Sequence, residues 1–327
     1  MPCSICLPPA ASGPVRTVRK PMRIGSPCAW ASIGKTRAAH SASVRNMGSS
    51  FERGKISMLK IGAEERALSP FELVEPRTLG EAIAALDGRD GAVRPMSGGT
   101  ALMLMMKAGV LRPSRLVNLR RLGLDQIKLG AQGELQIGAM VTLRALEKSP
   151  LLKGWRVIAH TLRTLSNVRV RNVATLGGHL AHGDPHMDLP PLLSALGATV
   201  TIAGPKGERH SPVEGIYAGY LETTLARDEL ITQLRVPPMG ERRAAYLKCT
   251  TRSADDWPAL GVAVVLDGQK TSIVVSAATD KPTRLASVEA AEALHIESDL
   301  HGSAAYKKQL LRVYLTRAIH EARHASR

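Results

Sequence analysis

The sequence is poor in aromatic residues: Phe, Trp and Tyr make up only 3% of its 327 residues. Proteins that bind single-stranded nucleic acid interleave stacking aromatics with basic residues, and no such run occurs in this chain. The formal net charge is +16, but residues 1–57 hold nine Lys and Arg against one acidic residue, which is half of the excess. The sequence therefore predicts no nucleic-acid binding.

Cysteine is also scarce, with four residues, of which Cys3, Cys6 and Cys28 lie near the N-terminus and only Cys249 lies further on. A single remote thiol builds neither a disulfide framework nor a metal-thiolate cluster. Any iron and sulfur must therefore belong to a partner, and we expect a reducing, cytoplasmic location. No apolar run approaches the roughly 20 residues that cross a bilayer, so we expect no membrane span.

Residues 1–57 are rich in Ser, Ala, Arg and Pro and lack apolar periodicity, which predicts a disordered leader. Such an Arg-rich, acid-poor start also resembles an organellar transit peptide. The simplest interpretation is that translation begins at Met58 and that the leader is a gene-model artefact. Leader peptides found by mass spectrometry in the natively expressed protein would contradict the artefact.

The rest of the chain predicts an α+β fold in three parts. In residues 68–125, strands alternate with helices, and Thr78 and Glu81 have capping-box spacing. Strands joined by helical crossovers predict a small parallel βαβ lobe. Residues 126–227 mix strands and helices in a second lobe. Residues 228–327 predict an antiparallel sheet with helices, and we expect the strand at 230–236 to belong to it.

Two short glycine loops are the most informative motifs: Ser97-Gly98-Gly99-Thr100 and Thr175-Leu176-Gly177-Gly178-His179. Paired glycines let backbone amides approach a diphosphate with no Cβ in the way. The first loop follows a predicted strand and precedes a predicted helix, where amides and helix dipole favour a phosphate. Either loop alone also fits an ordinary turn. Together they predict a dinucleotide held from both sides.

With these loops placed, the chain resembles the FAD-binding medium subunit of molybdenum hydroxylases, the family of carbon monoxide dehydrogenase and xanthine dehydrogenase. The resemblance runs from about Phe71 to His320. It rests on an ordered series of short motifs: Arg94 to Leu102, Val173 to Ala181, Asp184-Pro185, Asp188-Leu189-Pro190, Asp228 to Ile231 before Val236-Pro237, and Tyr246-Leu247-Lys248 with Arg252.

This resemblance implies an oxidoreductase subunit that holds one noncovalent FAD between its first two lobes. It implies a heterotrimer with a [2Fe-2S] iron-sulfur subunit and a molybdopterin subunit. Electrons would pass from the clusters through FAD to NAD, a quinone or another acceptor, and this chain would not choose the substrate. The alternative is a self-sufficient FAD-dependent oxidase or reductase with the same cofactor fold; a basic binding module is a third possibility.

The resemblance also assigns cofactor-binding positions and no catalytic residue. The amides from Ser97 to Ala101 and those of the second glycine pair would bind the FAD diphosphate, with two threonine hydroxyls as further donors. The family usually has Asp at position 101 and Asn at position 179. The positions are Ser97, Gly98, Gly99, Thr100, Ala101, Thr175, Gly177, Gly178, His179, Asp188, Ile231 and Lys248.

Several of these residues have a plainer interpretation. Asp188 can cap the helix expected at 189–196, and this role is compatible with a cofactor contact. Ile231 can be an ordinary buried strand residue. This role is compatible with a cofactor contact, because the family binds the cofactor through the backbone at this position. Lys248 can be an ordinary exposed strand residue, whereas the resemblance implies that its cation lies near the flavin. Tyr217 and Tyr220 lie in a segment that approaches the flavin ring in relatives, although half-buried tyrosines are common.

A metal site is the other hypothesis for the segment before residue 189. His182, Asp184, His186 and Asp188 alternate along the chain. Pro185, however, interrupts any helix that would place both histidines on one face. The sequence therefore predicts no bound metal.

Overall fold

The computed structural model describes residues 68–325 except 87, 252, 254 and 255, and they lie in one compact unit. The interpretations of the leader at 1–57, its three cysteines and the start at Met58 all fall outside the described residues. Within the described part of the chain, no helix combines the length and the apolar character needed to span a membrane.

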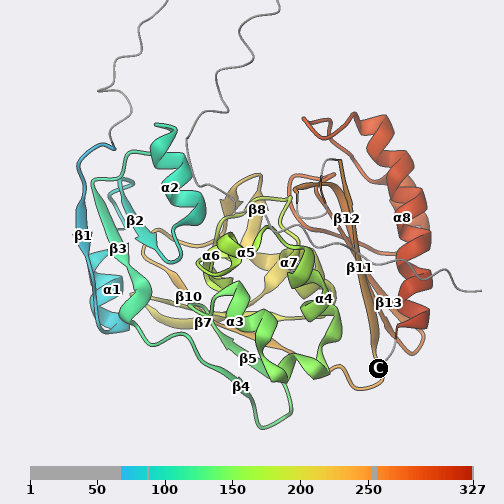
Figure 1. The fold of residues 1–327 in the computed structure, drawn as a ribbon, viewed down its shortest axis with the longest axis horizontal. Helices are drawn as coiled ribbons and strands as arrows, with labels where there is room; N and C mark the ends of the chain where they lie inside the picture. The colour runs from blue at the N-terminus through green and yellow to red at the C-terminus, as the bar shows by residue number, and fades with distance from the viewer. Residues whose placement is uncertain (1–67, 87, 252, 254–255, 326–327) are drawn as a thin grey trace, which may run out of the picture. The chain divides into compact units, whose positions relative to one another are not determined.

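The N-terminal part is a three-stranded parallel sheet, as the alternation of strands and helices predicted. Its strands β1 (Glu72–Val74), β2 (Val93–Met96) and β3 (Arg115–Asn118) run in the order β1-β3-β2. The helices α1 (Leu79–Ala85) and α2 (Thr100–Lys107) accompany this sheet (Figure 1). Thr78 and Glu81 form the predicted capping box at the start of α1.

The middle part is built on a five-stranded sheet in the order β4-β5-β10-β6-β7. The strands are β4 (Ile127–Leu129), β5 (Leu135–Gly138), β6 (Thr199–Gly204), β7 (Gly207–Pro212) and β10 (Leu230–Val236). The expectation that the strand at 230–236 belongs to the C-terminal sheet is wrong, because β10 pairs with both β5 and β6. Five of its seven residues are buried, as befits a central strand. The three-domain division at 125 and 227 stays a prediction.

Short helices cover this sheet and carry the second glycine loop (Figure 1). They are α3 (Leu143–Lys148), η3 (Pro150–Gly154), α4 (Arg156–Thr164), α5 (Val168–Arg171), α6 (Leu176–Ala181) and α7 (Leu189–Ala195). The shorter elements η2 (Leu119–Arg121), η4 (Val213–Ile216), β8 (Tyr217–Gly219) and β9 (Glu222–Thr223) complete this region.

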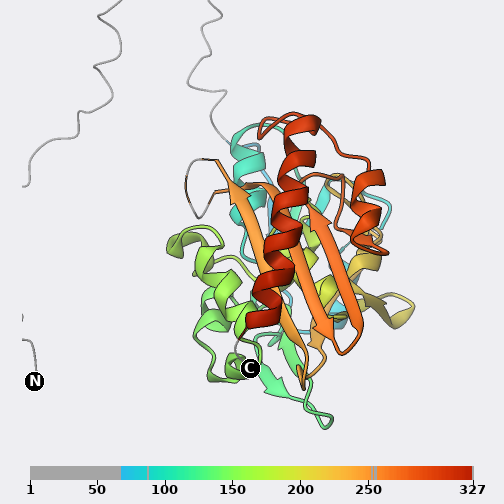
Figure 2. The ribbon, with the colours of Figure 1, turned by 90° about the vertical axis from the view of Figure 1, so that its right-hand side faces the viewer.

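The C-terminal part is the predicted antiparallel sheet, formed by β11 (Arg243–Thr250), β12 (Pro258–Asp267), β13 (Lys270–Ser276) and β14 (Thr283–Leu285). Figure 2 shows α8 (Ala304–His324) lying along one face of this sheet. Alternate residues of β12 explain the burial of both faces: Val262 and Val264 pack in the cluster with α8, and Ala263 and Val265 pack in the core of the middle part. The connection from β14 to α8 contains the 3-10 turn η5 (Glu289–Ala293).

Candidate functional site

The two glycine loops, nearly eighty residues apart in sequence, are in contact. The hydroxyl of Thr175 donates a hydrogen bond to Ser97 Oγ at 3.0 Å. A Cβ on Gly98 would lie 2.2 Å from the carbonyl oxygen of Val173, and a Cβ on Gly178 would lie 2.4 Å from Ser97 Oγ. Glycine is therefore required at Gly98, where the backbones of the two loops pack together, and Gly178 lies directly against the Ser97 hydroxyl.

The first loop leaves helix amides available for a ligand. Gly99 is the N-cap of α2 with φ +72, in the left-handed region that favours glycine, and no side chain caps the helix. The first-turn amides of Thr100 and Ala101 have no intrahelical acceptor. They stand at the positive end of the helix dipole, which favours a phosphate.

In the second loop, the expected donors have hydrogen-bond partners within the protein. The amide of Gly177 donates to Ala139 O at 2.8 Å, and the amide of Gly178 donates to Thr175 Oγ1 at 3.2 Å. Since the hydroxyl of Thr175 itself donates to Ser97, these three groups are occupied. Through these bonds they hold α6 against the residue that follows β5 and against the first loop. Their assignment to the diphosphate stays a prediction.

His179 supplies the unsatisfied polar atom of this loop. Its side chain is buried, and its Nε2 has no hydrogen-bond partner among the described residues. Burial lowers the pKa of His179 to about 3, with a further contribution from His182, so the imidazole is neutral. A buried, neutral, unpartnered nitrogen beside a glycine cradle fits a bound nucleotide, since buried polar groups are otherwise hydrogen-bonded.

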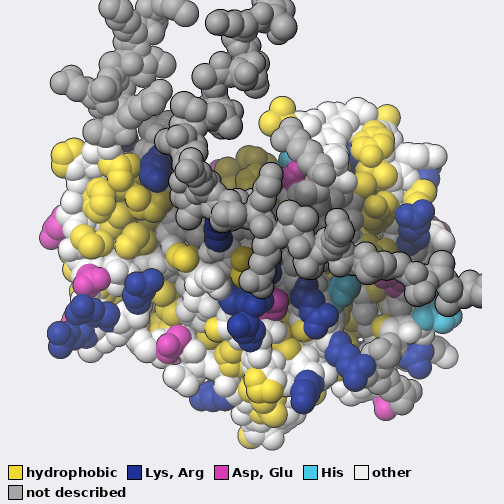
Figure 3. Space-filling view, in the orientation of Figure 1, with side chains coloured by type: hydrophobic (Ala, Val, Ile, Leu, Met, Phe, Trp, Pro, Cys, Tyr) yellow, Lys and Arg dark blue, Asp and Glu magenta, His cyan; other side chains and the backbone are white. Residues whose placement is uncertain are grey.

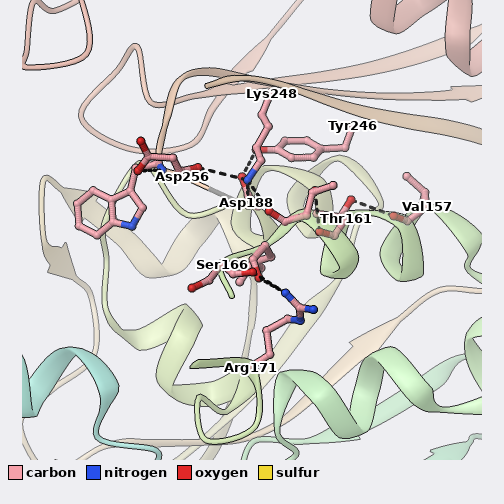
Figure 4. A network of polar contacts seen from close by, with 11 residues as sticks. Val157, Thr161, Ser166, Arg171, Asp188, Tyr246, Lys248 and Asp256 are labelled. Atoms are coloured by element: carbon pink, nitrogen blue, oxygen red, sulfur yellow. Dashed lines mark hydrogen bonds and ion pairs between the residues drawn. The ribbon is translucent and has the colours of Figure 1, made fainter. Parts of the chain in front are cut away.

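Asp188 and Lys248 form a buried ion pair between α7 and β11 (Figure 4). Lys248 Nζ lies 2.9 Å from Asp188 Oδ2, and the Tyr246 hydroxyl donates to Asp188 Oδ1 at 2.8 Å. Burial raises the pKa of Asp188, and Lys248 opposes this shift. Asp188 stands at the N-cap of α7 but makes no capping hydrogen bond. The capping interpretation is therefore wrong, and Lys248 is neither exposed nor uncompensated.

Arg171 and Lys248 fix the connection between α4 and α5 from two sides (Figure 4). Arg171 Nη1 donates to Leu165 O at 3.0 Å, its Nε pairs with Glu147 at 3.0 Å, and Lys248 Nζ donates to Thr164 O at 2.9 Å. Arg171 is buried, and sequence reasoning missed it. An arginine in a short helix carries no sequence signal for burial.

His186 belongs to a network of charged residues. Its Nδ1 lies 2.8 Å from Asp184 Oδ1 and its Nε2 lies 3.0 Å from Asp299 Oδ2. Lys307 of α8, which is 1% exposed, reaches the same Asp299 oxygen at 2.6 Å. In the part of the chain that the structure describes, no group of three or more potential ligands could hold a metal ion.

The remaining expected residues lie in the middle part. Ile231 is buried in β10 opposite Ile202, beside an irregularity in the strand pairing. Tyr217 is buried, and its hydroxyl has no partner among the described residues. Tyr220 is 55% exposed, so the two tyrosines lie in different environments.

Comparison with known proteins identifies the family. Residues 69–239 match the family described as the FAD binding domain in molybdopterin dehydrogenase. The chain belongs to this family. FAD is its cofactor, and it is a subunit of an oxidoreductase, as its sequence predicted.

Relatives of this FAD-binding chain match more than three quarters of its length. The carbon monoxide dehydrogenase medium chain of Afipia carboxidovorans is 31% identical over 77% of this chain and 96% of its own length. The glyceraldehyde dehydrogenase medium chain of Sulfolobus acidocaldarius is 28% identical over 77% of this chain and 98% of its own. A chain of the reconstituted CO dehydrogenase from Oligotropha carboxidovorans superposes with a TM-score of 0.74 at 29% identity, covering 80% of this chain and all of that one.

Proposed function

We propose that this chain is the electron-transfer subunit of a multi-subunit molybdenum hydroxylase. It would receive electrons from a [2Fe-2S] iron-sulfur subunit that stands beside a molybdopterin subunit. It would deliver them to an external acceptor such as NAD or a quinone. The observation that carries this proposal is the contact between the glycine loops at the open N-terminus of α2.

The binding residues divide into two roles. The segment from Ser97 to Ala101 presents first-turn amides to the diphosphate, and His179 offers its buried Nε2 as one further polar contact. Thr175, Gly177 and Gly178 position these groups by joining the loops. Ile231 adds backbone contacts from β10. When bound, FAD accepts and releases the electrons, and the protein supplies placement and electrostatics.

Asp188 and Lys248 would set the electrostatic environment at the flavin end of the site. A lone cation beside the flavin raises its reduction potential by stabilising added negative charge. Here the cation is paired with a carboxylate at 2.9 Å, so we expect only a small contribution. Replacement of Lys248 by Met leaves the Asp188 carboxyl without its counter-ion. A lowered reduction potential of the flavin in that variant supports the assignment. An unchanged potential places the pair away from the flavin.

The relatives support a division of labour among subunits. This chain is similar in sequence to the medium chains of a carbon monoxide dehydrogenase and of a glyceraldehyde dehydrogenase. Similar medium chains in enzymes with different substrates are consistent with substrate choice on another subunit. Cysteine is scarce after residue 28, which supports iron-sulfur clusters held by a partner subunit. The same scarcity supports a cytoplasmic location.

Affinity purification of the natively expressed protein tests the proposal. We expect noncovalent flavin, with iron and molybdenum in co-purifying subunits. Acid precipitation should release the flavin into the supernatant. Flavin that stays in the pellet of a protein without partners would favour the self-sufficient oxidase, and a protein that neither contains nor takes up flavin would contradict both functions.

A further inference from the structure

A cavity of about 780 Å³ lies between η3 and α4, the turn from β10 to β11, and the last turn of α8. Its wall on α4 is formed by Arg156 and Val157 at the start of the helix. The Lys248 contact with Thr164 is at the other end of α4. The cavity is therefore separate from the glycine loops and the Asp188 pair, and its volume is in the range of small-molecule sites.

The lining of the cavity carries an excess of positive charge. Three cationic residues, Lys153, Arg242 and Arg243, line the cavity with one carboxylate, Glu321, and Arg156 also lines it but has a partner of its own. The guanidinium of Arg242 donates to the carbonyl oxygens of Leu196 at 3.0 Å and Pro237 at 3.1 Å, and that of Arg243 donates to Arg323 O at 2.6 Å. Carbonyl acceptors leave the charge of a guanidinium uncompensated, so the cavity favours an anion. Figure 3 shows Lys and Arg side chains gathered over the α3 and α4 region of this face.

Flat rings supply the second recognition feature. His160, His320 and His324 line the cavity, and the rings of His320 and His324 are 4.3 Å apart. Trp155 forms a buried wall, with its indole N–H donating to Pro237 O at 2.9 Å. Rings and apolar groups at one wall and cations at another suit a planar base joined to phosphates.

The spacing of His320, Glu321 and His324 also matches the H-E-x-x-H pattern of zinc enzymes. No third ligand completes a metal site among the residues that the structure describes, and the surrounding cations repel a divalent ion. The imidazoles are therefore better suited to contact a base than to bind a metal.

We propose that this cavity binds a purine nucleoside diphosphate. Its phosphates contact Lys153 and Arg243, and its base contacts the imidazole rings. This site is distinct from the FAD site, and the proposal does not depend on how FAD is bound.

The test is a calorimetric titration of ADP into the protein as purified, with its flavin and any accompanying subunits. We expect saturable binding that leaves the flavin absorbance unchanged. Lys153→Gln should weaken ADP binding by about fivefold or more, because an anionic ligand loses a charge-assisted contact. Glu321→Gln should strengthen it. The matched control is Lys128→Gln on β4, an exposed lysine outside the cavity, which should leave the affinity unchanged.

Further titrations define the ligand class. His160→Ala should weaken ADP but not inorganic pyrophosphate, and adenosine should bind more weakly than ADP. Unfolding temperatures of all variants should match the parent, since the substituted side chains are exposed. The proposal is overturned if ADP does not bind, if pyrophosphate binds as tightly as ADP, or if Lys153→Gln and Lys128→Gln have equal effects. Release of flavin by ADP would place the nucleotide at the glycine loops and would also overturn it.

Discussion

At the scale of single residues, Gly98 is the position least tolerant of change in the cofactor loop. Gly98→Ala places a Cβ 2.2 Å from Val173 O and 2.9 Å from Ala174 Cα, both backbone atoms that cannot move aside cheaply. We expect a loss of about 1–3 kcal/mol in the free energy of unfolding and at least a tenfold loss of FAD affinity, measured by thermal unfolding and flavin titration. Gly80→Ala in α1 is the control, because its Cβ meets nothing within 4 Å. It should be neutral or stabilising.

His179 makes the folded protein sensitive to acid. Its folded pKa of about 3 lies below the unfolded value near 6.5, so the unfolded chain binds a proton that the folded chain excludes as pH falls below 6.5. The free energy of unfolding therefore falls by about 1.4 kcal/mol for each pH unit below 6.5. The free energy of unfolding of His179→Asn, relative to that of the parent, should therefore rise by about 2 kcal/mol from pH 8 to pH 5. Denaturant unfolding of both proteins at both pH values measures this change. An equal difference at both pH values would contradict a neutral, buried His179.

His186 has the opposite pH dependence. Burial alone lowers the pKa of His186, but its contacts with Asp184 and Asp299 outweigh burial and raise it. A raised folded pKa contributes stability below the unfolded value, and this contribution is lost as pH rises through the folded pKa. His186→Gln should therefore cost more stability at pH 6 than at pH 9 in chemical unfolding. Equal costs at pH 6 and pH 9 would contradict the contribution of the two carboxylates.

At the scale of elements, the Asp188 and Lys248 pair joins α7 to β11. Lys248→Met leaves a buried carboxylate without its counter-ion, and we expect a cost of about 3–5 kcal/mol. The double variant with Asp188→Asn should cost less than Lys248→Met alone, because it removes that charge as well. Arg312→Met breaks the exposed pair with Glu292 and should cost less than about 1 kcal/mol. Additive effects in the double-mutant cycle would show that the two side chains do not interact.

At the scale of the whole molecule, FAD should stabilise the fold by mass action. A ligand at 100 times its dissociation constant adds about 2.7 kcal/mol to the free energy of unfolding. We expect FAD added to the flavin-free protein to raise its unfolding temperature in a concentration-dependent way. Gly98→Ala should require higher FAD concentrations for the same rise, and Gly80→Ala should behave as the parent. A rise of equal size in Gly98→Ala would place FAD away from the glycine loops.

Local signals account for what was predictable in the fold. The capping box of Thr78 and Glu81 depends on residues three positions apart, and the structure contains it. The family resemblance predicted FAD as the cofactor. These features are encoded within short stretches of chain.

The sequence by itself determined where most strands and helices form and where the two glycine loops lie, because periodicity, caps and glycines act over a few residues. Only the tertiary structure decided that β10 joins the middle sheet, that the amides of Gly177 and Gly178 are already bonded, and that Lys248 and Lys307 are buried against carboxylates. The physical reason is that a pattern of residues reports how deeply a segment is buried, whereas the identity of its partners depends on groups far away along the chain.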